Sequence, residues 1–168
     1  MTPEAIALVQ QSFAKVKPIA PQAGLLFYQN LFHIAPELRP LFKADVSDQG
    51  RKLMDMLAIA VGMLNQPQRL AEAVTQLGTR HSDYGVEMAH FKPVGTALIM
   101  TLQEGLGSDF TPQVKSAWVD LYTEVMEAMA GGLKAANEQK KLAQLHAAQE
   151  AQQKLKSLPW WKRLFKQR

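Results

Sequence analysis

Apolar residues recur along the chain every three to four positions, which is the period of an amphipathic α-helix. Two prolines between residues 36 and 42 leave room only for a short helical turn. No segment alternates with a period of two between hairpin turns, so the predicted class is all-α, with about six substantial helices and one or two short ones. The six apolar stripes run through residues 6–16, 25–32, 53–64, 70–81, 94–102 and 114–129.

The ends of these helices carry recognisable start and stop residues. Thr2 and Thr111 each precede a proline, which places a capping hydroxyl before a residue suited to the first helical position. Ser47 and Asp48 are the predicted caps of the long third helix. The pair Gly131-Gly132 predicts an interruption of the last helix, because each glycine costs about 1 kcal/mol there relative to alanine.

The length of 168 residues predicts one domain, residues 1–133, followed by a C-terminal extension, residues 134–168. The extension holds nine Lys and Arg against Glu138 and Glu150, a net charge of +7, so the preceding domain carries −3 of the total of +4. Attraction to an anionic surface is therefore expected of the extension alone. Its first part, up to about residue 157, is predicted to be a weakly amphipathic helix with Leu142, Leu145 and Leu155 on its apolar side.

The chain ends in LPWWKRLFKQR, where Pro159 is expected to end that helix. Trp160, Trp161, Leu164 and Phe165 lie beside four cations in this segment and suit a bilayer interface. A partner protein, or a solubilising end with no partner, remains the alternative. Nucleic-acid binding is not expected, because no folded basic groove accompanies the cations.

Composition excludes several kinds of chemistry. The absence of cysteine rules out disulfides, thiolate metal sites and thioether-linked cofactors. The sequence has no phosphate-cradling glycine loop, HExxH motif or nucleophile elbow. It also lacks a signal peptide and a run of about 18 apolar residues, so we expect a cytoplasmic protein, with a peripheral position at the inner membrane face if the extension binds lipid.

Four residues stand out against this background. His81 lies on the apolar stripe of its helix, Tyr28 interrupts a mostly apolar helix, Gln49 lies four residues before Leu53, and Phe42 ends the short proline-bounded turn. A buried phenol or carboxamide costs about 1 to 3 kcal/mol if unpaired, and one polar ligand between them would satisfy both. An imidazole, an aromatic ring and two neutral donors suit a haem that binds a diatomic gas. From the residues alone, the alternative is that all three polar groups bond to the backbone.

A family resemblance favours the first interpretation. FYQNLFHIAPELRPLF (residues 27–42), QGRKLM (49–54) and LGTRHSDYGV (77–86) resemble segments of single-domain bacterial globins, which are related to the globin domain of flavohaemoglobins and similar to neuroglobin-like chains. PVGTALIMTLQEGLG (93–107) and the segment around Trp118 match the last two helices of that family. The resemblance covers about residues 2–133 and implies an all-α globin fold, with helices A to H in a three-over-three arrangement.

The resemblance also implies roles for individual residues. His81 would bind the iron of haem b (iron protoporphyrin IX) as its fifth ligand, with Tyr28 and Gln49 as donors on the opposite side and Phe42 stacked on the macrocycle. Lys52 and Arg80 fall where the family's basic residues reach haem propionates, although two solvated surface cations would look the same. The remaining haem contacts implied are apolar: Leu53, Leu57, Leu77, Val86, Val94 and Leu98.

The function implied is binding of O₂, NO and CO, together with dioxygenation of NO to nitrate. Electrons would have to come from an external reductase, because too few residues follow residue 133 for a flavin domain. Phe91 and Ala135 stand where flavohaemoglobins carry a tyrosine and a glutamate, which disfavours peroxidase-like O–O cleavage. The alternatives are a haem-based gas or redox sensor, or a membrane-docked globin, that signals through residues 134–168, and a globin-shaped module without haem.

Overall fold

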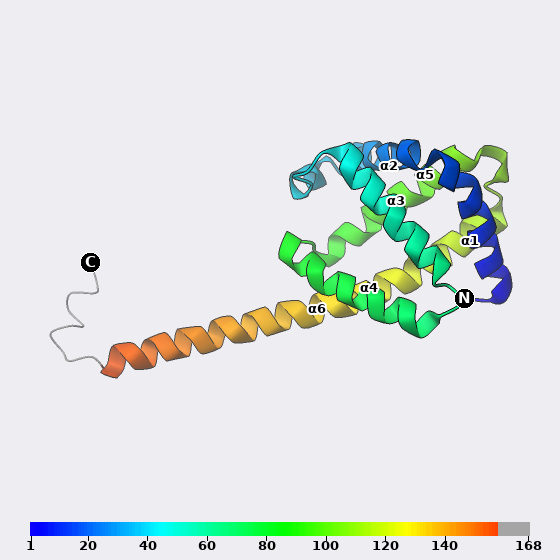
Figure 1. Ribbon diagram of the computed structural model, residues 1–168. Coiled ribbons are helices and arrows are strands. Elements are labelled where there is room, and N and C mark those ends of the chain that lie inside the picture. Colours follow the sequence, from blue (N-terminus) through cyan, green and yellow to red (C-terminus); the bar gives the residue numbers. More distant parts are fainter. Residues whose placement is uncertain (158–168) are drawn as a thin grey trace. The chain divides into compact units, whose positions relative to one another are not determined.

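A computed structural model describes residues 1–157 of the chain. Within that range all regular structure is helical, which confirms the all-α prediction (Figure 1). More short helices occur than the one or two expected, because most connections contain a 3₁₀ turn: η1 (Lys17–Ile19), η2 (Pro36–Leu41), η3 (Ser82–Tyr84), η4 (Met88–His90) and η5 (Gly107–Asp109). The α-helices are α1 (Pro3–Val16), α2 (Ala20–Ile34), α3 (Val46–Gly62), α4 (Pro67–His81), α5 (Phe91–Leu106) and α6 (Pro112–Ser157).

The starts of the helices follow the expected capping chemistry, with one correction. Thr2 and Thr111 cap α1 and α6, since each side-chain oxygen accepts a backbone N–H three residues on, at 3.2 and 3.3 Å. The predicted caps of α3 are wrong. Asp45 caps that helix instead, because its Oδ1 accepts the backbone N–H groups of Ser47 at 2.8 Å and Asp48 at 3.3 Å.

The predicted interruption of the last helix is also wrong, because α6 continues through Gly131 and Gly132 without a break. A Cβ at position 132 would overlap the carbonyl oxygen of Thr75 in α4, and a Cβ at Gly78 of α4 would overlap the carbonyl oxygen of Met129. The two glycines therefore let α4 and α6 cross with their backbones in contact. This close packing offsets the conformational cost of glycine in a helix.

Contacts divide the chain into two units, Met1–Leu133 and Lys134–Arg168. In the first, α2 packs on α3 and α5, and α1 packs on the same two helices. Val9, Leu31 and Trp118 are fully buried in its core. The indole Nε1–H of Trp118 donates to Ser12 Oγ at 2.9 Å, so the polar atoms at this depth are paired.

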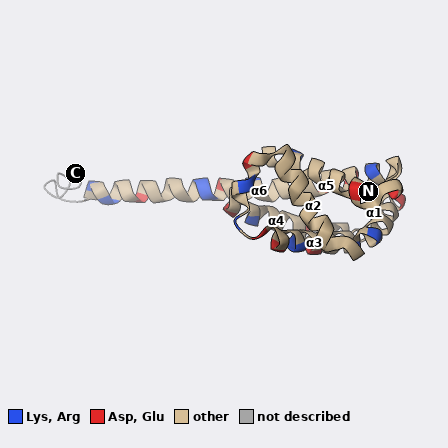
Figure 2. Cartoon of the chain, turned by 90° about the horizontal axis from the view of Figure 1, so that it is seen from above, with Lys and Arg blue, Asp and Glu red and all other residues tan. Residues whose placement is uncertain are grey.

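The described part of the second unit, residues 134–157, belongs to α6, and every residue from 137 to 157 is exposed. Lys and Arg outnumber Asp and Glu along it (Figure 2). No helix among residues 1–157 is both long enough and apolar enough to cross a membrane. Pro159 and the aromatic and cationic cluster after it lie outside the described residues.

Candidate functional site

His81 is the last residue of α4 and is half-buried. Its Nδ1 lies 2.8 Å from the carbonyl oxygen of Leu77, one turn earlier in the helix. Because a carbonyl can only accept, Nδ1 carries the proton, and the lone pair of the neutral ring is on Nε2. No residue among 1–157 forms a hydrogen bond with Nε2. The helix thus holds the imidazole in the tautomer that a metal ligand needs.

Tyr28 lies in α2 within a cluster of aromatic rings. Its ring centroid is 5.1 Å from that of Phe27, 5.7 Å from Phe32 and 5.1 Å from Phe42. The residue is 5% exposed, and this burial raises the pKa of its phenol to about 12, so the group remains a neutral donor at physiological pH. Phe42, which follows η2, is half-buried and completes the cluster.

The Tyr28 hydroxyl has no hydrogen-bond partner among residues 1–157. All fully buried side-chain nitrogen and oxygen atoms in that range do have partners. The Tyr28 oxygen must therefore reach accessible space, although the rest of the side chain is buried. The phenol is thus buried except at its hydroxyl, which leaves that donor free to bind a polar ligand.

Gln49 enters the same neighbourhood through the crossing of α2 and α3. Gly24 and Gly50 approach so closely that a Cβ on either would meet the other's backbone at 2.7 to 2.8 Å. Gly50 is adjacent to Gln49, and Gly24 lies one turn before Tyr28, so the carboxamide and the phenol belong to the two helices that cross here. The half-buried Gln49 side chain also has no hydrogen-bond partner in the described chain. Sequence reasoning missed both glycines, because neither segment indicates that the other lies against it.

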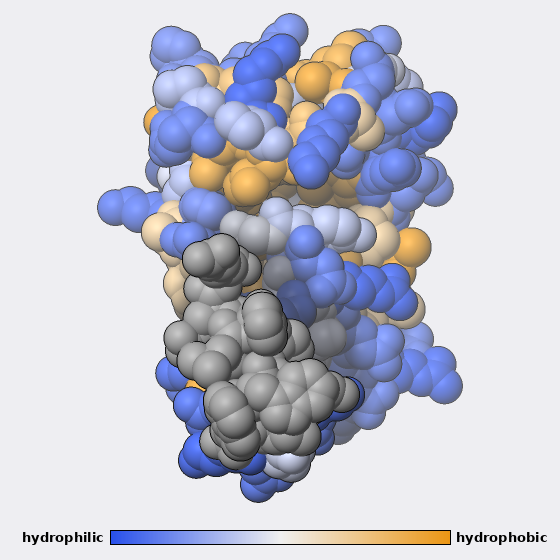
Figure 3. All heavy atoms as spheres, turned by 90° about the vertical axis from the view of Figure 1, so that its left-hand side faces the viewer, coloured by the Kyte–Doolittle hydropathy of each residue, from blue (hydrophilic) through white to orange (hydrophobic). Residues whose placement is uncertain are grey.

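Five of the six predicted apolar contacts are only half-buried, and the sixth, Leu98, is buried. Leu53 and Leu57 of α3, Leu77 of α4, Val86 and Val94 are all half-buried, and Leu98 is 7% exposed. On the face shown in Figure 3, apolar side chains reach the surface among hydrophilic ones. This set fits the walls of a hollow for an apolar ligand.

Lys52 and Arg80, the basic residues predicted to reach haem propionates, are exposed. They adjoin the candidate site in sequence, since Lys52 is one turn from Gln49 and Arg80 precedes His81. Neither forms an ion pair among residues 1–157. Both the propionate role and the solvated surface role agree with this exposure.

The candidate residues form two groups. Tyr28 and Phe42 are in ring contact, and Gln49 lies on α3, which packs on the helix that carries Tyr28. His81 and Leu77 form the second group, on α4. No hydrogen bond, ion pair or ring contact joins the two groups among residues 1–157. A flat apolar cofactor held between them fits this donor set: one free imidazole nitrogen, two neutral donors, apolar walls and cations at the rim.

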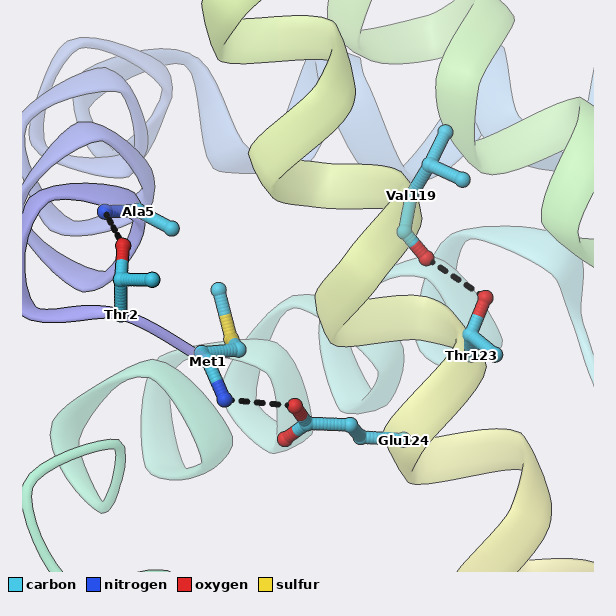
Figure 4. A network of polar contacts seen from close by, with 6 residues as sticks. All are labelled: Met1, Thr2, Ala5, Val119, Thr123 and Glu124. Carbon is cyan, nitrogen blue, oxygen red and sulfur yellow. Dashed lines mark hydrogen bonds and ion pairs between the residues drawn. The ribbon is translucent and has the colours of Figure 1, made fainter.

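A separate apolar cavity of about 290 Å³ contains none of these residues. Leu64, Leu70 and Val125 line it, and Met1 and Glu124 lie at its edge, where the amino group and the carboxylate pair at 2.7 Å (Figure 4). Its lining includes no histidine, and its one carboxylate, Glu124, is paired with the amino terminus. The free nitrogen of His81 and the Tyr28 hydroxyl therefore identify the candidate site better than cavity volume does.

Comparison with known proteins gives a consistent result. The globin family model matches residues 25–129, which include every candidate residue named above. Neuroglobin-1 of Oncorhynchus mykiss is 29% identical over 123 residues, covering 65% of this chain and 77% of that protein. The anaerobic nitrite reductase HBII of Casuarina glauca is 29% identical over 143 residues, covering 76% of this chain and 89% of that protein.

Proposed function

The chain belongs to the globin family, and from this premise we propose that it holds haem b through His81 and binds O₂, NO and CO. The all-α globin fold expected from the sequence is confirmed, and the family implies haem and gaseous ligands. Haem, when bound, supplies an iron atom with a free position for a diatomic gas. The observation that carries the proposal is the unpaired hydroxyl of the buried Tyr28.

On one side of the haem, His81 would be the protein's only ligand to the iron. The bond between Nδ1 and the Leu77 carbonyl fixes the ring's orientation and leaves the lone pair of Nε2 free for the iron. His90 is less suited to this role, because its Nδ1 already accepts the backbone N–H of Glu87 at 3.0 Å. Phe42 and the half-buried leucines would exclude water from the two faces of the macrocycle.

On the other side, Tyr28 and Gln49 would donate hydrogen bonds to a polar bound gas. The raised pKa of Tyr28, about 12, keeps its proton in place over the physiological range. Two donors slow the release of O₂, and slow release suits a scavenger or a reaction vessel better than a carrier. We therefore propose that the reaction is the dioxygenation of NO, in which NO, O₂ and one electron give nitrate.

In this proposal the electron comes from an external reductase. Phe91, which stands in place of a polar neighbour of the proximal histidine, is buried, and its carbonyl accepts the Tyr122 hydroxyl. No side-chain donor at this position would push electron density towards the iron. The lack of such a donor disfavours peroxidase-like O–O cleavage, and this agrees with the proposed dioxygenation of NO.

The name of the Casuarina glauca relative supplies a second candidate, reduction of nitrite to NO and water by one electron and two protons. That reaction needs proton sources, and a phenol with a pKa of about 12 is a weak one. The Tyr28 environment therefore favours stabilisation of bound O₂ over delivery of protons to nitrite.

One set of measurements tests the proposal. The purified full chain, loaded with hemin and reduced, should show a Soret band that CO shifts. Pulses of NO under air, with a flavin reductase and NADH present, should be consumed with one nitrate formed per NO. An anaerobic sample with nitrite reports the second candidate. A protein that stays colourless with hemin would overturn the haem assignment, and nitrite turnover without NO consumption would overturn the dioxygenation.

A further inference from the structure

We propose that the C-terminal extension, residues 134–168, docks the protein onto an anionic phospholipid bilayer. The gas-binding proposal concerns residues 28–98 and makes no use of this segment. The docking proposal depends on three properties of the extension: the exposure of its helical part, the arrangement of leucines and lysines on that helix, and the balance of charge along the chain.

The helical part of the extension displays apolar side chains that the described chain does not cover. Leu142, Leu145 and Leu155 are 56, 50 and 41% exposed. By contrast, the core leucines of the globin unit, such as Leu31, Leu102 and Leu121, are at most 4% exposed. Three exposed leucines in one helix represent apolar area that an interface would remove from water.

The three leucines share one side of the helix with lysines. At 3.6 residues per turn they fall within an arc of about 140°, and Lys134, Lys141 and Lys156 fall in the same arc. Glu138 is the one carboxylate there. A lysine can lay its methylene stem beside leucine and keep its ammonium group at the level of lipid phosphates. This is the composition of a helix that lies in a membrane interface rather than across the bilayer.

The distribution of charge identifies the partner as anionic. The extension carries +7 and the globin unit −3, so an anionic surface attracts one end of the chain and repels the other. Each Lys or Arg near an anionic leaflet increases membrane partitioning by roughly fivefold. The helical part alone contributes five lysines, distributed along its length in Figure 2.

The charge of the extension and the sequence after residue 157 favour a lipid partner over a second copy of this chain and over nucleic acid. Trp160 and Trp161 have the ring type that partitions to the headgroup region of a bilayer, and four cations follow them. A second copy of this chain would bring +7 against +7, which opposes association. Nucleic-acid binding proteins present cations from a folded groove, whereas Lys134, Lys141 and Lys156 share their arc with leucines.

The test uses the full chain and two kinds of vesicle, phosphatidylcholine alone and phosphatidylcholine mixed with phosphatidylglycerol. The protein should co-sediment with the mixed vesicles and not with the neutral ones. Replacing Lys134, Lys141 and Lys156 with glutamine should weaken this binding at least tenfold. The matched control replaces Lys17, Lys92 and Lys115, which are exposed cations of the globin unit, and should change binding by less than threefold.

Tryptophan fluorescence gives a second readout that does not depend on haem or on activity. Trp118 is fully buried, so a blue shift on adding mixed vesicles reports Trp160 and Trp161. The shift should disappear when both are replaced by serine. Equal binding to the two vesicle types, or equal losses from the two lysine triples, would overturn the proposal. So would tighter binding to duplex DNA than to vesicles, or a dimer in solution that Leu142→Gln with Leu145→Gln dissociates.

Discussion

Gly132 of α6 and Thr75 of α4 meet backbone to backbone, and the side chain of any other residue at position 132 would overlap the Thr75 carbonyl. One turn earlier in α6, Met129 meets Gly78 in the same way. His81 follows Gly78 by three residues on the same helix. The helix that leads into the extension therefore also fixes the helix that holds the candidate iron ligand.

This contact predicts opposite effects at two adjacent glycines. Gly132→Ala should destabilise the protein by about 1 to 3 kcal/mol, because the added methyl group must push two helix backbones apart. Gly131→Ala has open space around its Cβ position and should raise the stability by up to about 1 kcal/mol through helix propensity. Urea unfolding followed by circular dichroism measures both.

The neighbouring variant is the control, since both substitutions add one methyl group to the same turn of α6. In hemin-loaded protein, Gly132→Ala should also alter the stretching frequency between iron and the proximal histidine, whereas Gly131→Ala should not. Equal stabilities for the two variants would show that the crossing of α4 and α6 is looser than described.

Tyr28→Phe should raise the O₂ dissociation rate at least tenfold, because a hydrogen bond to a polar bound ligand is worth about 1.5 kcal/mol or more. It should not lower stability at pH 7, since the hydroxyl has no partner in the described chain. Tyr122→Phe is the matched control. Its hydroxyl donates to the Phe91 carbonyl at 2.5 Å, so its loss should cost about 0.5 to 1.5 kcal/mol of stability and leave O₂ release unchanged. Stopped-flow ligand exchange and urea unfolding separate the two effects, and an unchanged rate in Tyr28→Phe would remove this residue from the mechanism.

The number and type of the long helices could be read from periodicity, and the caps at Thr2 and Thr111 from local side-chain chemistry, because both depend on residues close in sequence. The cap of α3 was misassigned because Asp45, Ser47 and Asp48 all suit the role. Only the backbone geometry, with helix beginning at Val46, selects the first of them.

Contacts between helices explain the other differences. From the sequence alone, Gly132 predicts a break in the helix. Its contact with Thr75 explains why the helix continues, but neither segment indicates that the other lies against it. The contact between Gly24 and Gly50 could not be predicted from either segment for the same reason. It lies where the helices that carry Tyr28 and Gln49 cross. The candidate site could be predicted as a set of residue types, with the family resemblance assigning the roles, but the local sequence does not reveal that Tyr28 lacks a partner.

Alkaline unfolding should depend on Tyr28 and Tyr122, whose pKa values burial raises from 10.0 to about 12. Between these values the unfolded chain loses the two protons and the folded chain keeps them, so the unfolded state binds fewer protons. The stability is therefore fully present below pH 10 and falls as the pH rises towards 12. The double variant Tyr28→Phe with Tyr122→Phe should show a shallower fall in the urea midpoint over this range. An identical slope in wild type and double variant would contradict the burial of these phenols.

Replacing His81 with glycine should remove the protein's ligand to the iron while leaving a space of the same shape. Added imidazole should then enter that space and restore the wild-type Soret band, because its nitrogen can take the place of Nε2. The Leu77 carbonyl remains to accept the N–H of the added ring, as it does from His81 at 2.8 Å. His90→Gln is the matched control, since that imidazole is engaged with the Glu87 backbone and its loss should leave the spectrum unchanged. If the loss of His90 altered the spectrum and the loss of His81 did not, the iron ligand would be His90 and the assignment to His81 would be wrong.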